Sequence, residues 1–238
     1  MRKLAIILPL LAGFAAAPAH AQNLGLTGRA EVRGGYDEVR ADIRFQNSLL
    51  ADDFGVGDVM FGAEAGADAR ISQGVQVGVY GGVDFSQVDG CEENPFVNRV
   101  RERDRQDRVC VDAGRNIYAG ARVGVPMGNG GLIYGKGGFS EGRFSGSYTV
   151  TRVPQNSGQR VGEFFSGRDT VSGYHFGGGF ELGISSNFYV KGEYVQHRYK
   201  DAFRNLLNRD TTNPNPLSRT DEFDPHRHQI LLGFGIRG

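Results

Sequence analysis

The chain has 238 residues with 27 basic and 27 acidic side chains, so its formal net charge is zero. A balanced charge gives no electrostatic footprint for a nucleic-acid partner, and we expect none. The 37 glycines follow no collagen-like period, and the length suits one folded domain after a short leader.

The first residues have the pattern of a secretory signal peptide. Arg2 and Lys3 precede an apolar stretch, and Ala19-His20-Ala21 fits the small-x-small cleavage pattern. We predict a signal peptide over residues 1–21 and one mature domain over residues 22–238. The alternative is a membrane-anchoring helix, which the shortness of the apolar stretch disfavours.

Eight segments of the mature sequence alternate apolar and polar residues with the period of a β-strand. In chain order, the predicted strands cover residues 24–36, 57–69, 74–86, 113–125, 131–143, 172–184, 187–199 and 226–238. No apolar run in the mature sequence approaches the roughly 20 residues that a transmembrane helix needs. Membrane insertion would therefore have to use strands, closed into a barrel.

The connections between the predicted strands alternate between long and short. The short ones fall near residues 70–73, 126–130 and 185–186, and the long ones cover residues 37–56, 87–112, 144–171 and 200–225. Bacterial transmembrane barrels have an even number of strands, short periplasmic turns and long extracellular loops. The pattern predicts an all-β fold: an eight-stranded antiparallel up-and-down transmembrane β-barrel with four long extracellular loops. A soluble β-sandwich also alternates, so the prediction rests on alternation together with the leader and the loop asymmetry.

Parity along each predicted strand separates an apolar face from a polar face. In the second strand, Val59 and Phe61 share the apolar face, whereas Glu64 and Asp68 share the polar one. The predicted barrel-interior charge network comprises Arg29, Glu31, Arg33, Glu64, Asp68, Asp84, Arg122, Lys136, Glu181, Lys191, Glu193 and Arg237. The interior of an eight-stranded barrel is just wide enough for side chains to fill, and charges there must pair or be hydrated. We predict a salt-bridged plug; the alternative is an ion or proton path, or a catalytic carboxylate, among these charges.

The predicted loop over residues 87–112 carries two further features. Export makes a disulfide between Cys91 and Cys110 the default interpretation. A row of guanidinium groups between the two cysteines could bind lipopolysaccharide phosphates, and it consists of Arg99, Arg101, Arg103 and Arg105. The alternative is a solvated arm whose basic and acidic side chains pair with one another.

Three short patterns suggest other chemistry. Residues 233–238 match G-x-G-x-x-G, but no helix follows, so we expect no dinucleotide site. His226 and His228 share a strand face and could seed a metal site, although a place near lipid head groups is the favoured interpretation. Ser172 and His175 fall on opposite strand faces, which argues against a nucleophile and its base. We expect no catalytic residue, cofactor or metal.

The strand segments resemble the opacity/OmpA-like outer-membrane β-barrel proteins, a porin-like family of eight-stranded barrels. The resemblance covers residues 26–37, 62–85, 133–139, 177–194 and 228–238, and its sharpest motifs are Y-x-K in the fifth predicted strand and K-x-E-Y in the seventh. It implies a place in the outer membrane of a Gram-negative bacterium, insertion by the barrel assembly machinery, and contact with outer-membrane lipid and lipopolysaccharide. Members commonly end on an aromatic residue, and Gly238 departs from that pattern.

Together these patterns favour a non-enzymatic outer-membrane protein. We expect it to act in envelope structure, or in adhesion to a surface ligand through its extracellular loops. A small-solute pore is the first alternative. A lipid A-modifying membrane enzyme is the second, because some eight-stranded barrels carry such activities.

Overall fold

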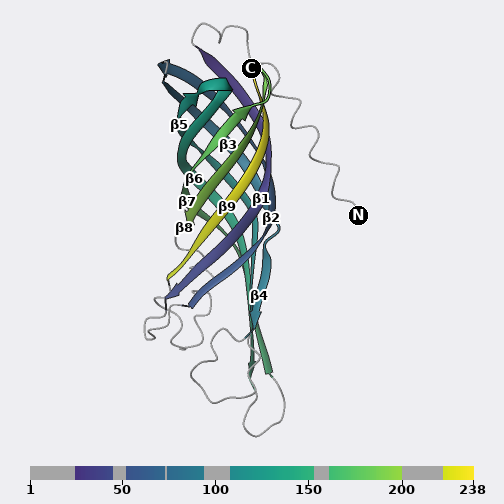
Figure 1. Ribbon diagram of the computed structural model, residues 1–238. Coiled ribbons are helices and arrows are strands. Elements are labelled where there is room, and N and C mark those ends of the chain that lie inside the picture. The colour runs from purple at the N-terminus through teal and green to yellow at the C-terminus, as the bar shows by residue number, and fades with distance from the viewer. Residues whose placement is uncertain (1–24, 45–51, 73, 94–107, 153–160, 200–221) are drawn as a thin grey trace.

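A computed structural model of the chain shows a single closed barrel of tilted strands (Figure 1). The structure describes residues 25–44, 52–72, 74–93, 108–152, 161–199 and 222–238. The predicted signal peptide, residues 1–21, lies outside the described residues. Within the described part, no helix is long and apolar enough to cross a bilayer.

The barrel wall consists of antiparallel strands that pair with their neighbours in chain order. The strands are β1 (Leu26–Arg44), β2 (Asp52–Ser72), β3 (Val75–Ser86), β4 (Asp89–Glu93), β5 (Arg108–Met127), β6 (Gly131–Arg152), β7 (Val161–Gly183), β8 (Phe188–Tyr199) and β9 (Glu222–Arg237). Pairing of β1 with β9 and of β3 with β5 closes the sheet. Because β4 continues the line of β3 along β5, the ring has eight strand positions, and the predicted eight-stranded barrel is confirmed.

Short connections gather at one end of the barrel, together with the C-terminus (Figure 1). One of them is the 3-10 turn η4 (Gly128–Gly130) between β5 and β6, where Gly130 has a φ of 75°, a value that favours glycine. Bacterial transmembrane barrels have their short connections on the periplasmic side. We therefore call this end periplasmic and the opposite end extracellular.

The strands continue further toward the extracellular end than the sequence pattern indicated. β1 runs to Arg44 instead of residue 36, β5 begins at Arg108 instead of residue 113, and β7 begins at Val161 instead of residue 172. The predicted long connections were therefore too long. Beyond the apolar band the outward positions become polar, as at Glu38 and Arg40, so the apolar–polar alternation ends while the backbone ladder continues.

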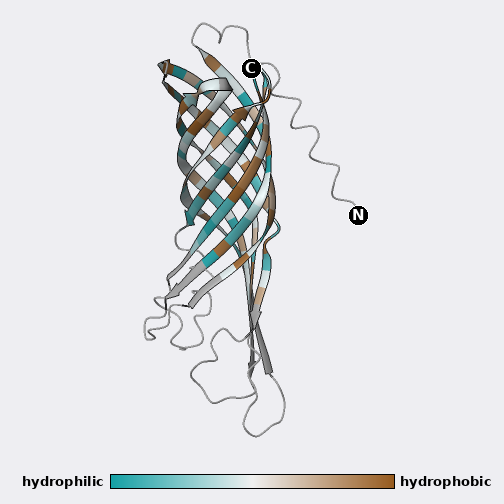
Figure 2. Cartoon of the chain, in the orientation of Figure 1, coloured by the Kyte–Doolittle hydropathy of each residue, from teal (hydrophilic) through white to brown (hydrophobic). Residues whose placement is uncertain are grey.

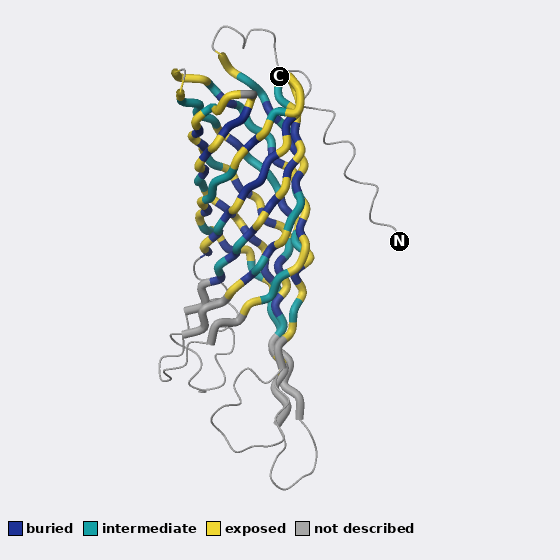
Figure 3. Tube along the Cα trace, viewed as in Figure 1, coloured by how far each residue is buried: buried dark blue, intermediate teal, exposed yellow. Residues whose placement is uncertain are grey.

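Inward and outward faces follow the predicted parity (Figures 2 and 3). On β2, Val59 and Phe61 are 55% and 41% exposed, whereas Glu64 and Asp68 are buried. Large apolar side chains cover the outside of every barrel strand from β1 to β9 except β4, with Phe139 of β6 the most exposed at 81%. This exposed apolar band is what a lipid-facing barrel surface requires.

Glycines on the inner face leave the space that the buried tyrosine rings occupy. A Cβ added to Gly82 of β3 would lie 2.1 Å from the Tyr118 hydroxyl and 2.6 Å from the backbone oxygen of Ala63. A Cβ added to Gly81, which faces outward, would meet nothing closer than 3.6 Å. The two adjacent glycines therefore differ in purpose, and only Gly82 is required by packing.

We expect Gly82→Ala to destabilise the barrel by about 1–3 kcal/mol, the usual cost of overpacking a filled interior. Gly81→Ala is the matched control and should be neutral or stabilising by up to about 1 kcal/mol, because it restricts the unfolded chain without a clash. The measurement is urea unfolding in lipid vesicles, followed by the difference in gel mobility between unboiled and boiled samples. Equal stability of the two variants would contradict this packing account.

Candidate functional site

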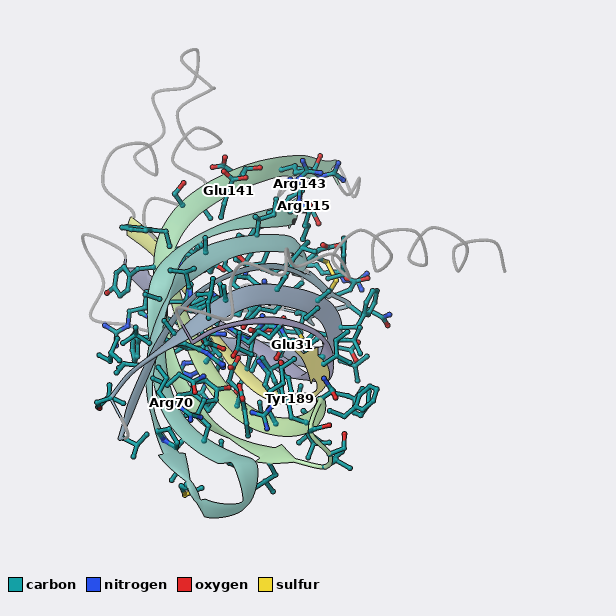
Figure 4. The ribbon with its side chains drawn as sticks, turned by 90° about the horizontal axis from the view of Figure 1, so that it is seen from above. Glu31, Arg70, Arg115, Glu141, Arg143 and Tyr189 are labelled. Carbon is teal, nitrogen blue, oxygen red and sulfur yellow. A yellow bond between two sulfur atoms is a disulfide. The ribbon has the colours of Figure 1, made fainter. Side chains whose placement is uncertain are left out.

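The lumen is the most chemically distinctive part of the molecule, because charged side chains fill it (Figure 4). Eleven of the twelve predicted interior charges are buried, with no residue more than 7% exposed; they are Arg29, Glu31, Arg33, Glu64, Asp68, Asp84, Arg122, Lys136, Glu181, Lys191 and Glu193. They project from seven different strands, and the closed ring brings them into one network.

Arg33 of β1 is the centre of this network. Its Nη2 lies 2.7 Å from Asp84 Oδ2 and its Nε 3.0 Å from Asp84 Oδ1, which makes a two-pronged contact. Its Nη1 donates to Glu64 at 3.2 Å and to Glu193 at 3.0 Å. Lys136 donates to the same two glutamates, at 2.7 Å and 3.1 Å. Two cations therefore share two carboxylates across the middle of the lumen.

A second group of ion pairs lies nearer the periplasmic end. Arg122 binds both oxygens of Asp68, at 2.8 Å and 2.6 Å, and also contacts Glu181. Lys191 contacts Glu31 and lies 3.1 Å from Glu193 Oε2. Two tyrosine hydroxyl groups also donate hydrogen bonds to these carboxylates. Tyr189 donates to Glu31 at 2.7 Å, and Tyr134 donates to Glu193 at 2.6 Å. Each buried carboxylate therefore has a cation or a hydroxyl beside it, as burial in low dielectric requires.

Arg237 is a correction to the predicted network. It is only partly buried, and its Nη2 donates to the backbone oxygen of Gly130 at 3.1 Å. Its guanidinium lies 5.7 Å from the Tyr189 ring centroid. As the last residue of β9, it reaches the periplasmic mouth, where water can solvate it, and so it needs no buried carboxylate.

Asp37 and Arg227 form a buried ion pair that the sequence analysis missed. Arg227 Nε lies 2.7 Å and 2.8 Å from the two oxygens of Asp37, and the two residues are 1% exposed or less. The sequence pattern predicts a connection from residue 37 onward, whereas Asp37 continues the inward parity of Arg29, Glu31 and Arg33 on β1. That parity is the signal that would have found it.

A chain of polar side chains joins five strands on the extracellular side of the central ion pairs. Tyr80 and His175 share a hydrogen bond at 2.6 Å, and Ser140 Oγ lies 2.8 Å from His175 Nδ1 and 3.0 Å from His197 Nδ1. Gln229 Oε1 lies 3.1 Å from the other ring nitrogen of His197. His175 therefore contacts Ser140 inside the lumen, whereas Ser172 is exposed on the outer face, as its opposite parity predicted.

Apolar side chains close the lumen toward the extracellular end. This apolar cap comprises Val39, Val88, Ala113, Phe144, Val171 and Tyr199, with Val56 packed against it. The rings of Phe144 and Tyr199 meet edge to face with centroids 5.1 Å apart. The buried charges and this cap therefore occupy successive levels of the lumen.

The remaining predicted site residues lie outside the lumen. Cys91 and Cys110 form a disulfide that joins β4 to β5 directly opposite one another. His226 and His228 face outward at the extracellular rim, where His228 shares a 2.7 Å hydrogen bond with Tyr194. Within the described part of the chain, no three His, Cys, Asp or Glu residues gather closely enough to hold a metal ion. The arginines at 99, 101, 103 and 105 lie outside the described residues.

A closed antiparallel ring with an apolar exterior and a charged, filled interior defines a transmembrane β-barrel. Residues 6–237 match the family described as "Outer membrane protein beta-barrel domain", which is nearly the whole chain. The chain belongs to this family, and family membership places it in the outer membrane. No curated protein sequence matches the chain.

Several solved structures are similar to the chain at low sequence identity. The attachment invasion locus protein Ail of Yersinia pestis is 13% identical, covering 87% of this chain and 98% of that chain with a TM-score of 0.36. Neisserial surface protein A is 11% identical, covering 89% and 96% with a TM-score of 0.35. The outer membrane protease OmpT of Escherichia coli is 9% identical, covering 90% and 96% with a TM-score of 0.41. Similarities at this level assign no activity to the chain.

The Asp37–Arg227 pair offers a test of how the interior charges contribute to stability. Arg227→Met should cost about 3–5 kcal/mol, because it leaves Asp37 buried without its cation. Adding Asp37→Asn should restore most of that loss, since no uncompensated charge then remains. Urea unfolding of wild type, both single variants and the double variant gives the coupling energy of the pair. Additive losses would mean that the two residues are not each other's main partner.

Proposed function

We propose that the protein is a non-enzymatic component of the outer membrane that acts through its outer surface, in envelope structure or in adhesion to a surface ligand. The observation that carries this proposal is the filled lumen, in which paired charges and the apolar cap occupy successive levels of the barrel. A barrel closed in this way presents its chemistry at its rims and in the segments between its extracellular strand ends. Those segments lie outside the described residues.

A small-solute pore is the alternative, and two layers oppose it. Solutes would first have to displace Lys136 from Glu64 and Glu193, where its ammonium group also lies 4.2 Å from the Tyr80 ring centroid. They would then have to cross the apolar cap, where a constriction without polar groups excludes water and ions. Opening the ion-pair layer alone therefore does not create a continuous aqueous path.

A lipid A-modifying enzyme is supported less well by the described residues. Such an enzyme needs a nucleophile and base that face the lipid. Of the described serines, Ser140 is the one whose hydroxyl bonds a histidine, and it is 4% exposed inside the lumen. Its two histidine partners are 1–2% exposed. A lipid substrate outside the wall does not reach this pair.

Conductance across a planar bilayer tests the closed lumen. The wild type should carry no steady current, and the double variant Glu64→Gln/Lys136→Met should remain closed because the apolar cap is intact. Adding Phe144→Ala to this variant should produce measurable openings, whereas adding the lipid-facing Phe139→Ala should not. A steady wild-type current would favour the pore. If the Glu64→Gln/Lys136→Met variant opens without the Phe144→Ala substitution, the charges, and not the cap, keep the barrel closed.

A comparison of three strains separates the surface role from the enzyme. One strain lacks the gene, one carries the full chain, and one carries the barrel with short glycine–serine turns in place of residues 45–51, 94–107, 153–160 and 200–221. We expect adhesion or detergent resistance to fall equally in the first and third strains, with the lipid A mass spectrum identical in all three. A lipid A mass change that depends on the gene would overturn the non-enzymatic proposal.

A further inference from the structure

The short strand β4 completes the barrel wall at the extracellular end, where it continues the line of β3 along β5 (Figure 1). It pairs with β5 over its five residues, Asp89–Glu93, and among the described residues no strand pairs with its other edge. On that side it packs against β2, since a Cβ on Gly90 would lie 2.1 Å from Val56 Cγ1. A ladder this short, on one edge only, holds a strand weakly.

The residue just before β4 is part of the apolar cap. Val88 is 1% exposed and packs in the cap with Ala113 of β5, which is 0% exposed. The backbone N–H of Ala113 donates to the Val88 oxygen at 3.0 Å, and the N–H of Gln87 donates to the Val59 oxygen at 3.1 Å. Separation of β4 from β5 would therefore break the bond to Ala113 and remove Val88 from the cap.

The disulfide joins these two strands close to the cap. Cys91 is the middle residue of β4, and Cys110 lies directly opposite it on β5. Val88 and Ala113 each lie three positions along the chain from one of these cysteines. Cys91 is exposed and Cys110 is partly buried, so a small molecule in water can reach the sulfur atoms.

The charges between the disulfide and the cap oppose the pairing of β4 with β5. Asp89 lies directly opposite Asp112, and both are exposed. Burial and the facing Asp89 raise the pKa of Asp112, although the charge of Arg168 offsets part of this effect. Like charges opposite one another on neighbouring strands destabilise the pair. The covalent bond therefore holds together a ladder that its own carboxylates weaken.

We propose that the Cys91–Cys110 disulfide is a redox switch for the apolar cap, and that small thiol reductants open it by thiol–disulfide exchange. A thiolate of the reductant attacks one sulfur, the bond between the cysteines breaks, and the displaced cysteine takes a proton from water. A second thiol of the reductant then attacks the mixed disulfide. The products are two cysteine thiols and the disulfide of the reductant.

Reduction should open the cap without opening the barrel. β4 separates from β5 and Val88 leaves the cap, whereas the ring stays closed because β3 pairs directly with β5. Export through an oxidising compartment forms the disulfide and delivers the barrel in its capped state. The switch concerns the lumen, so it does not depend on what the extracellular segments bind.

Hydrogen exchange of the folded protein in detergent, before and after treatment with dithiothreitol, tests the switch. Exchange at the Ala113 N–H should become about a hundredfold faster on reduction, because closing a loop of this length disfavours the separated strands by roughly that factor. Exchange in the β3–β5 ladder should not change. Cys91→Ser/Cys110→Ser should exchange at the reduced rate with or without dithiothreitol, and reoxidation of wild type should restore slow exchange.

Conductance shows whether the switch acts on the lumen. Dithiothreitol should produce openings in the Glu64→Gln/Lys136→Met variant, as Phe144→Ala does, because the cap and the ion-pair layer are then both open. Wild type should stay closed after reduction, since its ion pairs remain. A steady current in the absence of dithiothreitol would count against the closed lumen of the proposed function and not against the switch, which exchange at Ala113 measures separately.

Two controls make a negative result decisive. Alkylation with iodoacetamide, read by mass, shows that both cysteines are reduced, and the difference in gel mobility between unboiled and boiled samples shows that the barrel is folded. Unchanged exchange at Ala113 in reduced, folded protein would overturn the proposal. Loss of the folded mobility on reduction would also overturn it, because the disulfide would then support the whole barrel and not the cap alone.

Discussion

Closure of the sheet is the constraint on which the rest of this structure depends. In lipid every backbone N–H and C=O must be bonded, and the β1–β9 and β3–β5 ladders leave the ring without an open edge. Closure at eight strand positions also fixes a narrow interior. Side chains that point inward then have to fill that space completely, and this is why inner-face glycines such as Gly82 and Gly120 stand opposite the tyrosines Tyr118 and Tyr80.

The interior charges make the strand register costly to change. A slip of one residue would move a whole set of side chains to the other face. For β1 it would bring Arg29, Glu31 and Arg33 into the lipid and separate Arg33 from Asp84, Glu64 and Glu193. An apolar interior would tolerate such a slip better, because lipid and interior would then accept the same side chains. Buried ion pairs add little net stability, yet here they distinguish the correct ring from its shifted alternatives.

Parity along single strands was enough to predict eleven of the buried charges, because parity needs only the period of a strand. The barrel prediction also needed the leader and the alternation of long and short connections. The partners of those charges could not be predicted, because they depend on the stagger between strands that are far apart in sequence, as for Arg33 and Glu193. The contacts of Ser140 with His175 and His197 could not be predicted either, because they also depend on the stagger between strands. Asp37 was missed for a different reason: the apolar side of the alternation stops near the rim, although the inward side continues.

Because the lumen is filled, the surfaces that remain for binding a partner are the two rims and the outer face. The lumen charges are nearly all matched by partners within the barrel, so they present no net attraction to a ligand. At the extracellular rim charged side chains are exposed to water instead, as in the Arg40–Glu38 pair. The outer wall faces lipid along its apolar band, so a ligand dissolved in water meets the described barrel at its rims.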